Sequence, residues 1–158
     1  MNKIKVIPIG KINNDKGDAA IKLDEKYRAA LKGLEEYSHV QIVWWLDGCD
    51  NETDRARLIE KKPYKNGPEE IGVFALRSPE RPNPIAVSNA QITFVNMTNG
   101  IIGLTYVDAY DGSAVLDIKP YTPSTDRVEN PITPDWCSHW PKSVEESGEF
   151  DWVKEFNF

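Results

Sequence analysis

Short strand patterns joined by tight-turn residues, with little helical sequence between them, are the feature that most limits the fold of this chain. The segments Ile85–Val95 and Ile101–Val107 are apolar and rich in β-branched residues, and Asn99-Gly100 between them suits the positive φ angles of a hairpin turn. A second turn pair, Asp111-Gly112, precedes another strand pattern at 114–121. Strands that follow strands in this way pair antiparallel. The sequence therefore predicts a mainly β protein, a small antiparallel-rich β-barrel with a few short helices.

The first half of the chain predicts the remaining elements. His39–Leu46 is a nearly continuous apolar run, typical of a strand that is buried on both faces. We expect Asp24 to cap a helix, because apolar residues recur after it at helical spacing. We expect segment 51–62 to form either a short helix or an excursion of the chain away from the strands. Further strands are expected at 3–12, 19–23 and 71–76.

A chain of 158 residues fits one hydrophobic core, and its composition changes near residue 126. We expect residues 1–126 to form the barrel domain. Residues 127–158 are rich in proline and tryptophan and predict an irregular C-terminal arm, packed on the barrel or on a dimer partner. Trp136 and Trp140 lie four residues apart, and we assign them to packing rather than to the stacking of bases.

The charge and the cysteine content limit the class of protein. The formal net charge is −6, which argues against a broad nucleic-acid-binding face. Two cysteines lie far apart in sequence, and the first residues have neither an apolar core nor a cleavage-like site, so we expect a reduced, cytoplasmic protein. The sequence contains no apolar run of the length that spans a bilayer, so we expect no membrane insertion.

One polar segment gathers positive charge: Arg55, Arg57, Lys61, Lys62 and Lys65. Two interpretations stay open. The cations can form one face of a solvated helix, which is the commoner case, or they can form a footprint for a polyanion.

The segment 74–85, of sequence FALRSPERPNPI, places two arginines between three prolines. Each proline fixes its own φ and restricts the residue before it, so the arginines lose backbone freedom before any ligand binds. Rigid donors suit an anionic or carboxylate ligand, although a stiff surface turn gives the same pattern. Two histidines and two distant cysteines give no metal-ligand spacing, and no serine has the surroundings of a catalytic nucleophile. We therefore expect neither a metal site nor a nucleophilic triad.

Three ordered motifs carry a resemblance to a known family. The motif Arg77–Ile85, followed by Asp108–Tyr121 and preceded by Gly33–His39, resembles the TsaA-like, or TrmO, family of tRNA methyltransferases. The resemblance covers about residues 9–126 and implies a small β-barrel, a homodimer and binding of S-adenosyl-L-methionine. It also implies transfer of a methyl group to N6 of threonylcarbamoyladenosine beside the tRNA anticodon.

The resemblance also implies roles for individual residues. Arg77 suits the carboxylate of the methionine moiety, and Asp108 suits the ribose hydroxyls or the amino group. The residues implied for cofactor binding are Arg77, Val87, Asp108, Ala109, Tyr110 and Asp111. Asn83, Lys119 and Tyr121 are implied as catalytic residues that orient the base, and Arg81 and Lys119 as residues that bind the tRNA substrate.

The chain departs from the family pattern in its N-terminal region. A proline-rich and basic segment of the family is replaced by the short, acidic segment Asn13–Asp18. Two alternatives to the tRNA methyltransferase stay open for this reason. One is a non-catalytic domain that binds a small molecule or a partner through the same barrel, and the other is a methyltransferase for a different acceptor.

Overall fold

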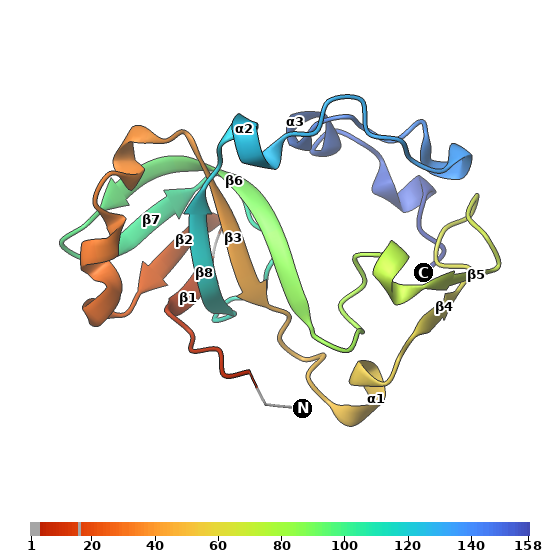
Figure 1. Ribbon diagram of the computed structural model, residues 1–158, viewed down its shortest axis with the longest axis horizontal. Helices are drawn as coiled ribbons and strands as arrows, with labels where there is room; N and C mark the ends of the chain where they lie inside the picture. Colours follow the sequence, from red (N-terminus) through yellow and green to blue (C-terminus); the bar gives the residue numbers. More distant parts are fainter. Residues whose placement is uncertain (1–3, 16) are drawn as a thin grey trace.

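The computed structural model describes residues 4–15 and 17–158, and its largest unit is a closed six-stranded barrel (Figure 1). Every strand pairing in the barrel is antiparallel, and the strands follow the order β1-β2-β7-β6-β3-β8. The strands are β1 (Gly10–Asp15), β2 (Asp18–Leu23), β3 (His39–Trp45), β6 (Ile85–Asn96), β7 (Ile101–Leu104) and β8 (Ala114–Pro120). The predicted fold class, a small antiparallel β-barrel, is confirmed.

The barrel closes where β1 meets β8. Gly10 pairs with Val115 and Lys11 with Ala114. A side chain at residue 10 would overlap the backbone of Lys22 on β2, so only glycine lets the strands approach this closely. The core inside the barrel is aliphatic, and its fully buried side chains are Ile12, Ile21, Leu31, Val40, Ile42, Ile102, Val107 and Val115.

Strand β3 differs from the expectation of burial on both faces. Its residues alternate between buried and half-buried, so one face lines the core and the other faces outward. Val40 and Ile42 belong to the core, whereas Gln41 and Val43 lie on the outer surface between β6 and β8. The second half of the run is continuously apolar because the outer residues Val43 and Trp45 are apolar as well.

Several predicted boundaries move. Strand β1 begins at Gly10 rather than near residue 3; residues 1–3 lie outside the described part of the chain. The helix after Asp24 is a 3-10 helix, η1 (Glu25–Leu31), followed by η2 (Leu34–Glu36). Residues 71–76 were expected as a strand but form the end of β5 (Glu70–Gly72) and the 3-10 helix η3 (Val73–Ala75). In the β6–β7 turn only Gly100 has a positive φ, of 68°, so the turn is longer than the two-residue type that Asn99-Gly100 favours.

Between β3 and β6 the chain leaves the barrel and forms a separate lobe (Figure 1). This excursion contains α1 (Glu52–Arg55), the two-stranded sheet of β4 (Ile59–Lys61) and β5, and η3. After β8 the chain forms α2 (Pro123–Asp126) at the top of the barrel. The C-terminal arm then crosses to this lobe and contains η4 (Asp135–Cys137), α3 (Val144–Ser147) and η5 (Trp152–Lys154).

Aromatic side chains anchor the arm to the lobe. The Tyr64 ring lies 5.1 Å from Trp136, 5.0 Å from Trp140 and 5.7 Å from Phe156, measured between ring centroids. The amide of Lys65 donates to the carbonyl of Glu155 at 2.9 Å. These tryptophans therefore pack within the protein, as expected, but their partner is the excursion between β3 and β6 rather than a barrel strand.

Glu155 is the buried acid of this arm. Its carboxylate accepts hydrogen bonds from His139 Nε2 at 2.9 Å and from Trp140 Nε1 at 3.0 Å. These two hydrogen bonds, that of His139 first, hold the pKa of Glu155 below its ordinary value. The acid therefore stays charged, which stabilises the arm.

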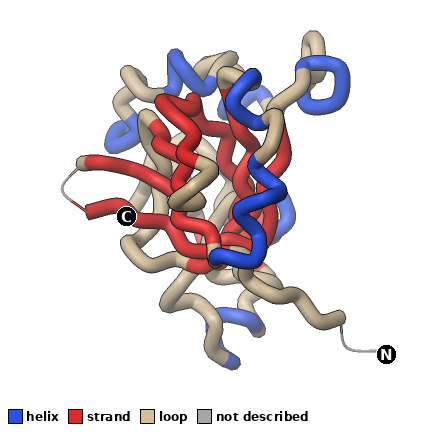
Figure 2. Tube along the Cα trace, turned by 90° about the vertical axis from the view of Figure 1, so that its left-hand side faces the viewer, coloured by secondary structure: helices blue, strands red, loops and turns tan. Residues whose placement is uncertain are grey.

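Figure 2 shows the molecule from the barrel side, with the strands in red, and in this view the lobe and the arm overlap the barrel. Throughout residues 4–15 and 17–158, the helices lack the length and the apolar character needed to cross a bilayer.

Candidate functional site

The directions of three strands bring the two predicted cofactor-binding segments to the same end of the barrel. Strands β6 and β8 both run antiparallel to β3, and Trp44 near the end of β3 pairs with Ala86 on one side and with Val115 on the other. The proline loop, residues 76–84, leads directly into β6, and the Asp108–Asp111 turn comes just before β8. Both therefore open at the lower end of the barrel in Figure 1.

Arg81 holds the proline loop from within. Its guanidinium donates to the carbonyl of Val73 at 2.9 Å, and more weakly to those of Leu76 at 3.3 Å and Ser78 at 3.4 Å. The side chain is half-buried beneath the loop. We expected Arg81 to bind substrate, but the structure directs three of its N–H groups to its own backbone, where they fix the shape of the loop.

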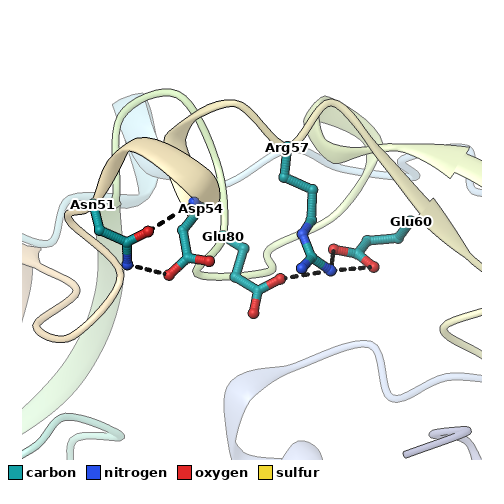
Figure 3. Close-up of polar contacts among 5 residues, drawn as sticks. All are labelled: Asn51, Asp54, Arg57, Glu60 and Glu80. Atoms are coloured by element: carbon teal, nitrogen blue, oxygen red, sulfur yellow. Dashed lines mark hydrogen bonds and ion pairs between the residues drawn. The ribbon is translucent and has the colours of Figure 1, made fainter.

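Two further arginines hold the loop from the excursion. Arg55 donates to the carbonyl of Pro82 at 2.7 Å and lies over the ring of Trp45. Arg57 lies between two acids, at 2.8 Å from Glu80 of the loop and 3.1 Å from Glu60 (Figure 3). These contacts tie the proline loop to the residues around α1.

The cation-rich segment 55–65 is therefore mainly structural. Lys62 pairs with Glu69, and Lys65 donates to the carbonyl of Val153 at 2.9 Å. Only α1 of this segment is helical, and it is four residues long, with Asn51 as its cap (Figure 3). Neither the long helix face nor a free polyanion footprint describes these residues, because acids and carbonyls engage four of the five cations.

Arg77 is the arginine of this region that the loop leaves available. Its side chain is exposed, and within the described residues it has no hydrogen bond and no ion pair. Three other arginines hold the loop that carries it, and its free guanidinium is the group that can pair with a carboxylate or phosphate.

The Asp108–Asp111 turn presents two carboxylates at this end of the barrel. Asp108, Tyr110 and Asp111 are exposed, and Ala109 packs against the core. The pKa of Tyr106 lies above its ordinary value, first because of partial burial and then because of the nearby Asp108 carboxylate. The turn thus carries negative charge at the end of the barrel where the proline loop carries the positive charge of Arg77.

The other predicted residues divide between two places. Asn83 is exposed on the proline loop, and Val87 is a half-exposed residue on the outer face of β6, paired with Val43. Lys119, ion-paired with Asp117, and Tyr121 lie toward the opposite end of β8. The six residue-to-residue steps from Val115 to Tyr121 span about 20 Å of extended chain, so one protomer does not bring Lys119 and Tyr121 to the proline loop.

Two hollows of the protein lie beside η1, away from these loops. Two open hollows of about 430 and 180 Å³ lie between η1 and β8, and Ala30 and Ile118 line both. Neither is lined by the proline loop or the Asp108–Asp111 turn. Within the residues that the structure describes, no three His, Cys, Asp or Glu side chains are placed to hold a metal ion. The pKa of the Cys49 thiol is raised, first by burial and then by Asp54 and Glu80.

Sequence reasoning missed three residues that build this site. Arg55 and Arg57 were counted only as members of a charge cluster, because nothing in the sequence shows that the chain folds back on the proline loop. Asn14 was considered only as part of the short, acidic segment Asn13–Asp18, yet its side chain and its amide bind the segment 107–111.

These features define a class of protein: a closed antiparallel barrel whose loops carry an exposed guanidinium and two exposed carboxylates at one end. The chain belongs to the family described as tRNA-methyltransferase O N-terminal domain, which matches residues 2–127.

Similar proteins agree with this assignment. A probable S-adenosyl-L-methionine-binding protein of Halobacterium salinarum is 34% identical over 102 residues, which are 65% of this chain and 74% of that protein. A tRNA (adenine(37)-N6)-methyltransferase of Mus musculus is 40% identical over 101 residues, which are 64% of this chain and 22% of that protein. The crystal structure of TrmO from Pseudomonas aeruginosa superposes with a TM-score of 0.63 at 26% identity, over 83% of this chain and 62% of that one. The chain thus spans only part of these relatives.

Proposed function

We propose that this protein binds S-adenosyl-L-methionine at the end of the barrel where the proline loop meets the Asp108–Asp111 turn, and methylates N6 of an adenosine in tRNA. The acceptor is threonylcarbamoyladenosine beside the anticodon. The observation that carries the proposal is the free guanidinium of Arg77, held by a loop that Arg55, Arg57 and Arg81 fix in place.

The residues present fit this ligand chemically. Arg77 is matched to the carboxylate of the methionine moiety, and Asp108 to the ribose hydroxyls or the ammonium group. Val87, Ala109 and Tyr110 complete the lining, and Asp111 belongs to the turn that carries Asp108 and Tyr110. When bound, S-adenosyl-L-methionine supplies a methyl group that its sulfonium already activates. The protein then needs only to position the acceptor and exclude water, so a site without a nucleophilic triad is sufficient.

A homodimer completes the site in this proposal. Asn83 orients the base from the proline loop of one copy, whereas Lys119 and Tyr121 lie too far away within that protomer. We place these two residues at the site of the partner copy, whereas Arg81 serves the site of its own copy by holding the proline loop. The dimer also doubles the few cations available for tRNA. Both cysteines are free thiols, in keeping with a cytoplasmic protein.

Binding of the cofactor is tested by calorimetric titration with S-adenosyl-L-homocysteine. Loss of one charged hydrogen-bonding group costs about 1.5–3 kcal/mol, so we expect Arg77→Ala to weaken binding by about 10- to 150-fold. Arg127→Ala is the matched control, because Arg127 is also exposed and lies on the arm after α2. Equal affinities of the Arg77→Ala variant and the wild type would contradict the proposed site.

The acceptor is tested by mass spectrometry of nucleosides in tRNA from a strain that lacks the gene. We expect methylated threonylcarbamoyladenosine to disappear and to return with the wild-type gene but not with the Arg77→Ala variant. An unchanged level together with tight cofactor binding indicates a different acceptor. An unchanged level without cofactor binding supports the second candidate function, a non-catalytic binding domain, which the net charge of −6 favours.

A further inference from the structure

Asn14 joins two parts of the chain that are far apart in sequence. Its side-chain amide Nδ2 donates to the carbonyl of Ala109 at 2.7 Å and to that of Val107 at 3.1 Å. Its backbone amide donates to Asp111 Oδ1 at 2.9 Å. One half-buried asparagine of the β1–β2 hairpin therefore uses three donated hydrogen bonds to hold the segment 107–111.

The backbone around Asn14 strengthens this connection. Gly112 N donates to the carbonyl of Ile12 at 2.8 Å, and Ile12 N donates to the carbonyl of Ser113 at 2.8 Å. The turn is thus fixed to β1 directly after Asp111. Asn14 adds the contacts that reach the exposed part of the turn, where Asp108 and Tyr110 point to solvent.

The two carboxylates of the turn consequently differ in role. Oδ1 of Asp111 accepts the Asn14 amide, which is a structural contact that any oxygen acceptor at this position can make. Asp108 has no hydrogen bond and no ion pair with the hairpin residues that the structure describes, 10–15 and 17–23. This difference separates a carboxylate that shapes the turn from one that is available to a ligand.

We propose that Asn14 is a positioning residue for cofactor binding and that Asp111 acts through Asn14 as a hydrogen-bond acceptor, not through its charge. The inference rests on the proposed function, because it assigns the Asp108–Asp111 turn to the cofactor site. It explains how the short segment Asn13–Asp18, which replaces a longer segment of the family pattern, still contributes to that site.

The test compares two pairs of variants. Asn14→Ala removes the side-chain donors, and Asn13→Ala is its control, because Asn13 is exposed and its side chain makes no hydrogen bond in the described residues. Asp111→Asn keeps an oxygen acceptor without the charge, whereas Asp111→Ala removes both. Each variant is checked for folding by thermal melting, and Asn14→Asp replaces Asn14→Ala if the latter fails to fold.

Two measurements are made on each variant. Hydrogen exchange at the amides of Gly112 and Ser113 reports the turn itself, and titration with S-adenosyl-L-homocysteine reports the site. We expect Asn14→Ala and Asp111→Ala to accelerate exchange and to weaken binding by about tenfold, the effect of one or two lost hydrogen bonds. Asn13→Ala and Asp111→Asn are expected to stay within about threefold of the wild type in both.

The outcomes separate this inference from the proposed function. Equal exchange in Asn14→Ala and Asn13→Ala overturns the inference whatever the ligand does. Loss of binding in Asp111→Asn as large as in Asp111→Ala, with unchanged exchange, assigns Asp111 a charged contact and also overturns it. If the wild type binds no S-adenosyl-L-homocysteine while Asn14→Ala exchanges faster, the proposed function fails and the connection between hairpin and turn stands.

Discussion

Replacing Arg81 by alanine gives the sharpest test of how the proline loop is held. The change removes the guanidinium that donates to Val73 at 2.9 Å and to Leu76 and Ser78 at 3.3 and 3.4 Å. A hydrogen bond from a charged donor contributes about 1.5–3 kcal/mol, and the two long contacts add little. Because the side chain is only half-buried, we expect the free energy of unfolding to fall by about 2 kcal/mol.

Urea unfolding followed by tryptophan fluorescence measures this loss. A decrease of about 2 kcal/mol corresponds to a melting temperature lower by about 4–8 °C for a chain of this size. The matched variant is Arg77→Ala, four residues earlier in the same loop. Since Arg77 is exposed and unpaired in the described structure, its removal is expected to change stability by less than about 0.5 kcal/mol.

The two variants are therefore expected to lose different properties. Arg81→Ala lowers stability, and Arg77→Ala lowers affinity for S-adenosyl-L-homocysteine at unchanged stability. If both variants lose the same stability, or if Arg81→Ala unfolds at the wild-type urea concentration, the division of the loop into one holding and one binding arginine is wrong.

Three further predictions concern the rest of the fold. Tyr64→Ala removes three aromatic pairs, worth about 0.5–1.5 kcal/mol each, so limited proteolysis should cleave the C-terminal arm faster than in the wild type while the barrel resists. The hydrogen bond of His139 is the first cause of the lowered pKa of Glu155, so the charged carboxylate contributes its full stabilisation above pH 4.5. This stabilisation declines as the pH falls through the pKa of Glu155 in the folded protein. Melting temperatures measured against pH should show the decline, and Glu155→Gln should abolish it. Gly10→Ala forces a side chain into the backbone of β2 and should cost about 1–3 kcal/mol in urea unfolding, whereas Gly148→Ala, with ordinary contacts, should cost less than about 0.5 kcal/mol.

The sequence could predict elements that depend on local preferences. The strands around residues 39–46, 85–95 and 114–121 follow from apolar and β-branched runs bounded by turn residues, and all three are present. The sequence could not predict that one face of β3 lies outside the core, because an apolar outer position and an apolar inner position look alike. Boundaries such as the start of β1 at Gly10 depend on where a partner strand ends, which is a property of the fold.

The amino-acid sequence alone determined the fold class, the family and the composition of the proline loop, since these depend on residue types and spacings along the chain. Only the tertiary structure decided the roles of the individual arginines. Arg55, Arg57, Arg77 and Arg81 carry the same charge, but acids and carbonyls that the fold brings near engage three of them and leave Arg77 exposed. The hydrogen bonds of Arg55 to Pro82 and of Asn14 to Ala109 join residues that are 27 and 95 positions apart in sequence. Strand pairing and chain reversal bring these residues together, so no local sequence pattern predicts the contacts.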